Sequence, residues 1–256
     1  MKTTTAFFHK ELIELKRTGK LLILFLIFTL FGIMNPAIAK LTPWLVSTFA
    51  DSFAEAGIIM TDMTVDALTS WTQFYKNVPM ALIIFLLLFS NILTSEYQKG
   101  TLIPLLTKGL PRINVIVSKT LLLLLAWTCG YWLCYGITYA YNAFFWDNHI
   151  ASHPAFAALC PYVLGIWLIS LLMLMSTLFE SGSAVITSTG GIFIALYLLS
   201  LLPRIQDYLP AKLLSSLPIL YKTETIEAFL GALGTSAFLT IINLILSVLL
   251  FDKKRI

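Results

Sequence analysis

The chain has 256 residues, of which 58% are hydrophobic and only 12% are charged, whereas soluble domains carry charge on about 25% of their residues. A mean hydropathy of +0.87 excludes a soluble globular domain, because a chain of this length cannot bury so much apolar surface in its own interior. The formal net charge is +4, and in a membrane protein its distribution along the chain reports orientation. We therefore expect an all-α membrane protein, with residues 1–256 forming a single transmembrane domain.

The first predicted element is an amphipathic helix over residues 5–20 that lies on the membrane surface. Phe8, Leu12 and Leu15 recur at helical spacing on one face with Phe7 beside them, and the charged side chains lie mainly elsewhere around the helix. We expect its apolar face to lie in the membrane interface.

Six apolar runs are long enough to cross a bilayer as helices. Asn35-Pro36 lies near the far end of the first run, where we expect a kink or an end of the helix. The mixed stretch from Lys40 to Val78 is too polar to span, so we expect an ordered loop with short helices there. A second structured loop with broken helices is expected from Pro203 to Thr225. The predicted spans are 21–39, 79–94, 113–146, 156–179, 184–202 and 226–251.

Uncharged polar and small residues stand out within these runs. Asn91 and Asn243 are expected to lie at depth and to hydrogen-bond between helices. Ser183, Thr187, Gly191 and Ala195 recur every four positions, which predicts a smooth helix face suited to close packing.

The most informative stretch is Ser95–Arg112, which we call the docking segment. It is charged and then amphipathic, and it separates the second and third spans, where a short turn would suffice. We expect a short helix, Leu102–Leu106, bent at Pro104 and ended by Gly109 and Pro111. A short helix of this kind is suited to a groove on a soluble partner; a basic loop bound to anionic lipid is the other interpretation.

Orientation follows from the lysine and arginine count. With six spans both termini lie on one side, and that side together with the docking segment carries twelve of these residues, whereas the opposite side carries five. The positive-inside rule therefore predicts that both termini and the docking segment are cytoplasmic.

The sequence offers no catalytic machinery. It contains no G-x-x-x-x-G-K-[ST] phosphate loop, and the hydroxyl residues of the fourth span have no histidine or lysine partner in the apolar runs. His149 and His153 are four residues apart, but they fall in a predicted hydrated loop. We therefore expect no catalytic residue, no metal site and no cofactor bound by this chain, and nothing indicates a nucleic-acid partner.

The docking segment resembles the hallmark of type-2 ABC exporter permeases. In that family a pattern similar to E-x-x-x-G-T-L-x-x-L-L-x-x-P-x-x-R joins the second and third spans. Here Glu96, Gly100-Thr101-Leu102 and Arg112 match it, whereas Gly109 stands in the usual proline position and a proline follows at Pro111. The segment Phe-Phe-His-Lys-Glu-Leu before the first span also resembles the interfacial connecting helix of the family.

The resemblance implies a permease subunit of the bacterial cytoplasmic membrane that pairs with a second permease, expected to be an identical chain, and with two copies of a separate ATPase subunit. ATP and Mg would be bound by that partner. The spans would move an amphipathic or hydrophobic cargo, such as a peptide, a bacteriocin or a drug, out of the cell. The residues implied to contact the ATPase subunit are Glu96, Tyr97, Lys99, Gly100, Thr101, Leu102, Leu105, Leu106, Glu11 and Glu14. The residues predicted for helix packing or the translocation path are Asn91, Ser183, Thr187, Gly191 and Ala195.

Other functions stay open at this point. Within the same class, the cargo could be sodium or another small solute. In a different class, the chain could be a membrane scaffold that recruits a soluble partner and transports nothing. An intramembrane enzyme is the weakest alternative, because the apolar runs lack a nucleophile paired with a base.

Overall fold

The computed structural model describes residues 2–49, 65–107 and 109–254. Over these residues the chain is helical, and six of its helices are long and apolar enough to cross a membrane. This confirms the predicted all-α fold with six candidate spans. The helices are α1 (Lys2–Arg17), α2 (Lys20–Thr48), α4 (Ala67–Phe89), α5 (Thr94–Lys99), α6 (Leu102–Thr107), α7 (Arg112–Phe145), α8 (Pro154–Leu178), α9 (Gly182–Leu199) and α10 (Glu227–Lys253), with short 3₁₀ turns η1 (Asn148–Ile150), η2 (Gln206–Tyr208), η3 (Pro210–Ser215) and η4 (Leu217–Ile219).

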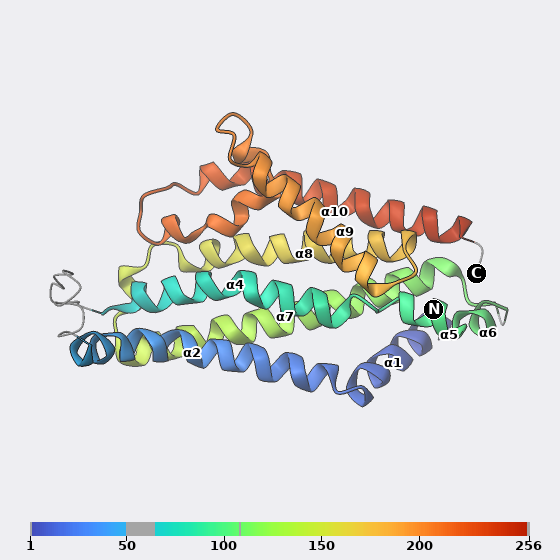
Figure 1. Ribbon diagram of the computed structural model, residues 1–256, viewed down its shortest axis with the longest axis horizontal. Coiled ribbons are helices and arrows are strands. Elements are labelled where there is room, and N and C mark those ends of the chain that lie inside the picture. The colour runs from blue at the N-terminus through green and yellow to red at the C-terminus, as the bar shows by residue number, and fades with distance from the viewer. Residues whose placement is uncertain (1, 50–64, 108, 255–256) are drawn as a thin grey trace.

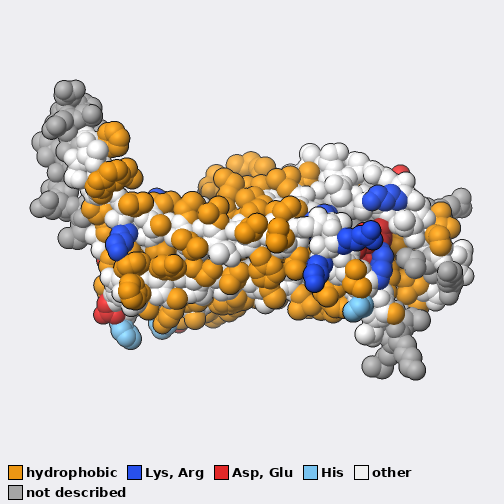
Figure 2. All heavy atoms as spheres, turned by 90° about the horizontal axis from the view of Figure 1, so that it is seen from below, with side chains coloured by type: hydrophobic (Ala, Val, Ile, Leu, Met, Phe, Trp, Pro, Cys, Tyr) orange, Lys and Arg blue, Asp and Glu red, His pale blue; other side chains and the backbone are white. Residues whose placement is uncertain are grey.

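The spans lie side by side along the long axis of the molecule (Figure 1). Helices α2, α4 and α7 pack together, and α8 packs most extensively on α10. Both termini, α1, α5 and α6 lie at one end, and the turns η1 to η4 lie toward the other. Figure 2 shows a hydrophobic flank along the length, with lysine and arginine side chains gathered near the end that carries α1. An apolar flank with charged side chains near one end is the distribution expected for helices that cross a membrane and have that end in water.

Two predicted boundaries were wrong. Helix α2 continues through Pro36 and Pro43 to Thr48, because neighbouring helices can satisfy the backbone groups that each proline leaves unpaired in a membrane helix. Helix α4 begins at Ala67 and not near residue 79. At this start the Asp66 carboxylate accepts a hydrogen bond from the Thr69 amide at 2.9 Å. The loop predicted from Lys40 to Val78 is therefore helical at both ends, and its middle, residues 50–64, lies outside the described residues.

The core of the fold is aromatic. The Trp127 ring lies 5.4 Å from the Phe85 ring and 5.8 Å from the Phe28 ring, both in edge-to-face geometry. These rings join α7 to α4 and α2. Close approach of α8 depends on Gly165, because a methyl group built there would collide with the Trp127 indole. Bulky rings on one helix thus face a glycine on its neighbour.

Polar side chains tie the spans to one another. The Asn77 amide donates to the Asn35 side-chain oxygen at 2.7 Å, and the Asn35 amide donates to the Thr138 hydroxyl at 3.0 Å, which links α4, α2 and α7. The Asn243 amide donates to the Ser170 hydroxyl at 3.1 Å, which links α10 to α8. The hydrogen bond between helices predicted for Asn243 is confirmed; such bonds hold membrane helices in register.

Helix α9 packs on α8 and η3 through a narrow face. Val185 and Thr189 are buried on that face, whereas Ser183, Thr187, Gly191 and Ala195 are exposed. The small-residue stripe therefore faces away from the rest of the chain, and the expectation that it packs against another helix is not met within this chain. Its ridge is smooth and open.

Replacing Gly165 with alanine is expected to destabilise the protein by about 1–3 kcal/mol, because overpacking forces Trp127 out of its position. Gly136→Ala on α7 is the matched control, since a methyl group there meets no atom within 4 Å. Thermal unfolding in detergent measures both. Equal midpoints for the two variants would contradict this account of the α7–α8 contact.

Candidate functional site: a buried charge cluster beneath the docking segment

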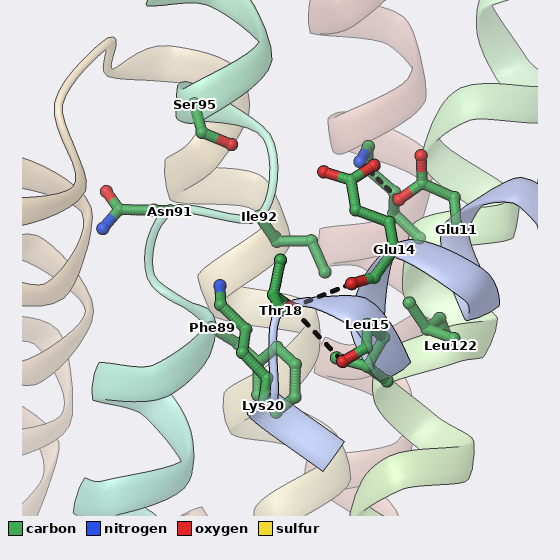
Figure 3. A pocket seen from close by; sticks show the side chains of 11 residues that line it. Glu11, Glu14, Leu15, Thr18, Lys20, Phe89, Asn91, Ile92, Ser95 and Leu122 are labelled. Atoms are coloured by element: carbon green, nitrogen blue, oxygen red, sulfur yellow. Dashed lines mark hydrogen bonds and ion pairs between the residues drawn. The ribbon is translucent and has the colours of Figure 1, made fainter. Parts of the chain in front are cut away.

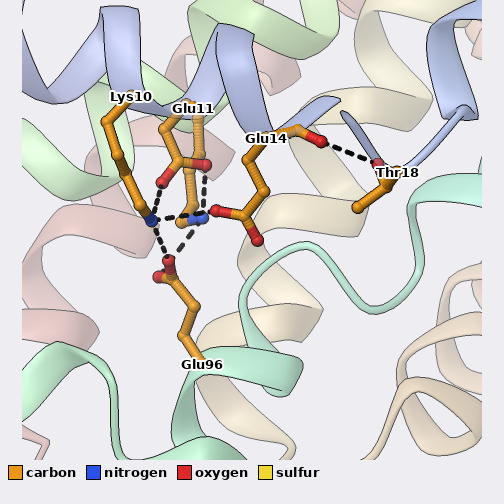
Figure 4. Close-up of polar contacts among 6 residues, drawn as sticks. Lys10, Glu11, Glu14, Thr18 and Glu96 are labelled. Atoms are coloured by element: carbon orange, nitrogen blue, oxygen red, sulfur yellow. Dashed lines mark hydrogen bonds and ion pairs between the residues drawn. The ribbon is translucent and has the colours of Figure 1, made fainter. Parts of the chain in front are cut away.

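A cluster of five charged side chains joins three helices at the end of the molecule that carries the termini (Figure 4). Helix α1 supplies Lys10, Glu11 and Glu14, α5 supplies Glu96, and α7 supplies Lys119. We call these five side chains the charge cluster. Gly19, with a φ of 72°, allows the chain to turn between α1 and α2, so that α1 folds back toward α5 and α7.

Lysines alternate with carboxylates in the cluster. The Lys119 ammonium lies 2.8 Å from Glu11 Oε2 and 3.2 Å from Glu96 Oε2. The Lys10 ammonium lies 2.9 Å from Glu11 Oε1 and 3.0 Å from Glu96 Oε1. Each of these two carboxylates therefore bridges both lysines, and Glu14 adds a third contact to Lys10 at 3.0 Å.

Three members of the cluster are almost completely buried. The residues Glu11, Glu96 and Lys119 expose 4%, 4% and 2% of their surfaces. Burying a charge is costly unless an opposite charge compensates it at close range. The cluster therefore fixes the relative positions of α1, α5 and α7, because separating any two of these helices would take at least one ion-pair partner from a buried charge.

Lys10 and Glu14 form the solvent-facing side of the cluster. Burial by itself would lower the pKa of Lys10, but the hydrogen bond to Glu11 and the charge of Glu96 outweigh it and raise the pKa. Burial would raise the pKa of Glu14, but its hydrogen bond to Lys10 and that lysine's charge hold the pKa below its usual value. Both shifts favour the charged forms.

The cluster is not a ligand site in this arrangement. Glu11, Glu14 and Glu96 place oxygen atoms close enough together to hold a metal ion, but two lysine ammonium groups already lie among these oxygens and make ion pairs with them. The adjoining pocket between α1 and the turn after α4 has a volume of about 50 Å³ (Figure 3), well below the roughly 300 Å³ of a small-molecule site.

The far end of the docking segment is tied to the last span. Arg112 Nη1 donates to the carbonyl oxygens of Phe251 and Asp252 at 3.1 and 3.0 Å and of Lys254 at 2.6 Å. These are carbonyls at the end of α10, where helices leave their acceptors unpaired. The Lys254 ammonium in turn lies 4.1 Å from the centre of the Tyr97 ring. Arg112 and Lys254 thus join α7, α10 and α5.

The docking segment also touches the end of α8. The Gln98 amide donates to the Glu180 carbonyl at 3.1 Å, and the Lys254 ammonium donates to the Thr177 carbonyl at 3.1 Å.

Gly100 ends α5 with a φ of 64°, and Gly109, with a φ of 87°, turns the chain after α6. Pro104 lies inside α6 and does not interrupt it, in contrast to the predicted bend, because the first turn of a helix tolerates proline.

The structure separates the predicted docking residues into two groups. Glu96, Glu11 and Leu102 are buried within this chain, so their side chains hold the segment in place. Lys99 and Thr101 are exposed together with Ile103, which is 49% exposed. Among the others, Tyr97, Gly100 and Leu106 are partly exposed, Glu14 is exposed, and nothing is described for the side chain of Leu105.

Sequence reasoning missed two of the anchoring residues. Lys119 is buried between two carboxylates, and Lys10 contacts the same two carboxylates from the solvent side. The face of α1 that packs inward carries Phe7, Glu11 and Leu15, whereas Leu12 of the predicted apolar face is 44% exposed. The four-residue spacing of this triplet was a usable signal, but it required accepting a glutamate on a buried face.

The predicted path residues do not come together in one site. Asn91 lies in the turn after α4 and not at depth in a span, where its side chain approaches Gly182 at the start of α9. The four stripe residues lie on the open face of α9. Asn91 therefore belongs to the end that carries the charge cluster.

The fold and this site define a multi-pass helical membrane protein whose loop between the second and third spans is anchored by buried charges. Comparison of the chain with protein-family models and with curated protein sequences finds no match.

Replacing Lys119 with methionine is expected to destabilise the protein by about 3–5 kcal/mol, because Glu11 and Glu96 remain buried beside a single lysine that is itself partly exposed. Lys99→Met is the control, since Lys99 is exposed at the same end. Unfolding in detergent micelles measures both. A loss for Lys119→Met no larger than that of the control would overturn the assignment.

Proposed function

We propose that the chain is the membrane-spanning permease subunit of an ATP-binding cassette exporter, driven by two copies of a separate ATPase subunit. It would lie in the bacterial cytoplasmic membrane with both termini in the cytoplasm, pair with a second permease, and move an amphipathic or hydrophobic cargo outward. The chain itself would bind no nucleotide and catalyse no reaction. ATP and Mg would bind to the partner.

One observation carries the proposal: the docking segment is firmly anchored on its inner side and open on its outer side. The charge cluster joins it to α1 and α7, and Arg112 joins it to α10. The exposed side presents Ile103 and borders a groove of about 320 Å³ lined by Ile103, Leu106, Thr107, Leu110 and Arg112. An exposed apolar residue on an anchored short helix is suited to receive displacement from a soluble partner.

Anchoring matters for a transporter because force must reach the spans. A loop that ended in flexible turns would absorb the movement of an ATPase. Here a displacement of α5 and α6 would be passed to α7 through Lys119 and to α10 through Arg112. A scaffold that only recruited a partner would not need these ties, so the geometry favours transport over the scaffold alternative.

Ile103→Asp is expected to abolish co-purification of a phosphate-loop ATPase with the affinity-tagged chain from its own cells, because it places a charge in the apolar contact. Ile150→Asp is a closely matched control: Ile150 is 46% exposed, against 49% for Ile103, and lies in η1 at the opposite end. Mass spectrometry of the purified complexes identifies the ATPase. Equal recovery with both variants would contradict the proposed docking surface.

The second permease is expected to pair through the open face of α9. Gly191→Leu should leave expression and folding intact, since a side chain there meets no atom of this chain within 4 Å, but it should weaken pairing and impair transport by blocking close helix approach. Gly234→Leu on the exposed side of α10 is the control. Cross-linking in membranes measures the paired fraction; unchanged pairing and transport in Gly191→Leu would reject this role of the stripe.

A further inference from the structure

An apolar cavity of about 220 Å³ lies on the flank of the molecule between α4 and α9, and α8 and η3 complete its lining. Helix α4 contributes Pro79, Leu82, Ile83 and Leu86, and α8 contributes Leu168. Its remaining lining comes from Thr189, Gly190, Phe193 and Ile194 of α9 and from Leu214 of η3. The cavity is separate from the charge cluster and from the docking segment, whose residues do not line it.

The chemistry of the walls defines what the cavity can hold. The lining side chains are hydrocarbon except for Thr189, whose hydroxyl donates to the Val185 carbonyl at 2.7 Å and is therefore already paired. A ligand with a charge or an unpaired hydrogen-bonding group would lose its hydration there without compensation. The cavity is suited to hydrocarbon alone.

The position of the opening identifies the source of that hydrocarbon. All the lining residues except Leu214 belong to candidate membrane spans, and one side chain of the lining, Ile83 on α4, is 53% exposed. Exposed apolar side chains of this kind on membrane spans face lipid chains. The cavity is thus continuous with the lipid-facing flank, and the hydrocarbon that reaches it is that of the bilayer.

We propose that this cavity binds one acyl chain of a bilayer lipid, which packs between α4 and α9. Helix α9 is the span held least firmly by the rest of the chain, because it packs mainly on α8 and η3 and buries few of its residues completely. An acyl chain in the cavity supplies packing on the α4 side, where α9 would otherwise lose dispersion contacts. The bound chain therefore acts as a removable part of the α9 packing.

The test uses the full-length chain reconstituted in vesicles of pure phosphatidylglycerol that carries a photoreactive diazirine in the middle of one acyl chain. Lipid is then the only hydrocarbon present, so a labelled cavity cannot reflect an exported cargo. After illumination, mass spectrometry compares labelling of the cavity segments, 82–86 and 190–194, with labelling of Leu249, which is 53% exposed on α10.

In the wild-type chain the cavity segments are expected to be labelled more strongly than Leu249. Gly190→Trp fills the cavity from the α9 side, where a side chain meets no atom within 4 Å at its Cβ, and should reduce cavity labelling roughly tenfold, corresponding to about 1.4 kcal/mol of lost binding free energy. Leu86→Trp fills it independently from the α4 side and should have the same effect. Gly234→Trp should leave labelling unchanged.

Two results would overturn the proposal. Labelling of the cavity segments no stronger than that of Leu249 would mean that the cavity has no preference over ordinary lipid contact. Unchanged cavity labelling in both Gly190→Trp and Leu86→Trp would mean that the labelled lipid lies outside the cavity. Neither result bears on the docking of an ATPase, so the two proposals fail separately.

Discussion

The rest of this structure depends on the burial of opposite charges at one end of a largely apolar molecule. Lys119, Glu11 and Glu96 come from three different helices and are almost fully enclosed. The burial of these charges is tolerated because Lys119 lies within 3.2 Å of both glutamates, and because the two glutamates also share Lys10. The arrangement does not add much net stability over an apolar core, but it specifies one relative position of α1, α5 and α7, since displacing any of these helices takes at least one opposite charge from a buried one.

These contacts hold both ends of the docking segment in place against the spans. Its first helix is held by the charge cluster, its end is held by Arg112 on the carbonyls of α10, and its outer side is open at Ile103. Helix α9, in contrast, is loosely packed: it buries few residues and borders the apolar cavity. The molecule thus combines a firmly anchored end with one loosely packed span.

Much of the fold could be predicted from the length of the apolar runs alone, because the sequences of α7, α8 and α10 contain few charged residues that would oppose insertion into a membrane. The prediction failed where burial inside the protein replaced exposure to lipid. The first turns of α4 are polar on average, yet Trp71, Phe74 and Val78 form a buried face at helical spacing. Glu11 was implied to contact a partner subunit and is instead buried in this chain. Only the position of Lys119, distant in sequence, makes a buried Glu11 favourable, and periodicity within one helix contains no such information.

The central claim is that Glu96 and Lys119 stabilise the protein through each other. A double-mutant cycle with Glu96→Gln, Lys119→Met and the combined variant, using the free energy of unfolding in detergent micelles, measures this directly. The account predicts a favourable coupling energy of about 1–3 kcal/mol between the two positions, so that the combined variant is less destabilised than the sum of the single ones. Strict additivity would contradict the account, because it would mean that these two buried charges stabilise the fold independently.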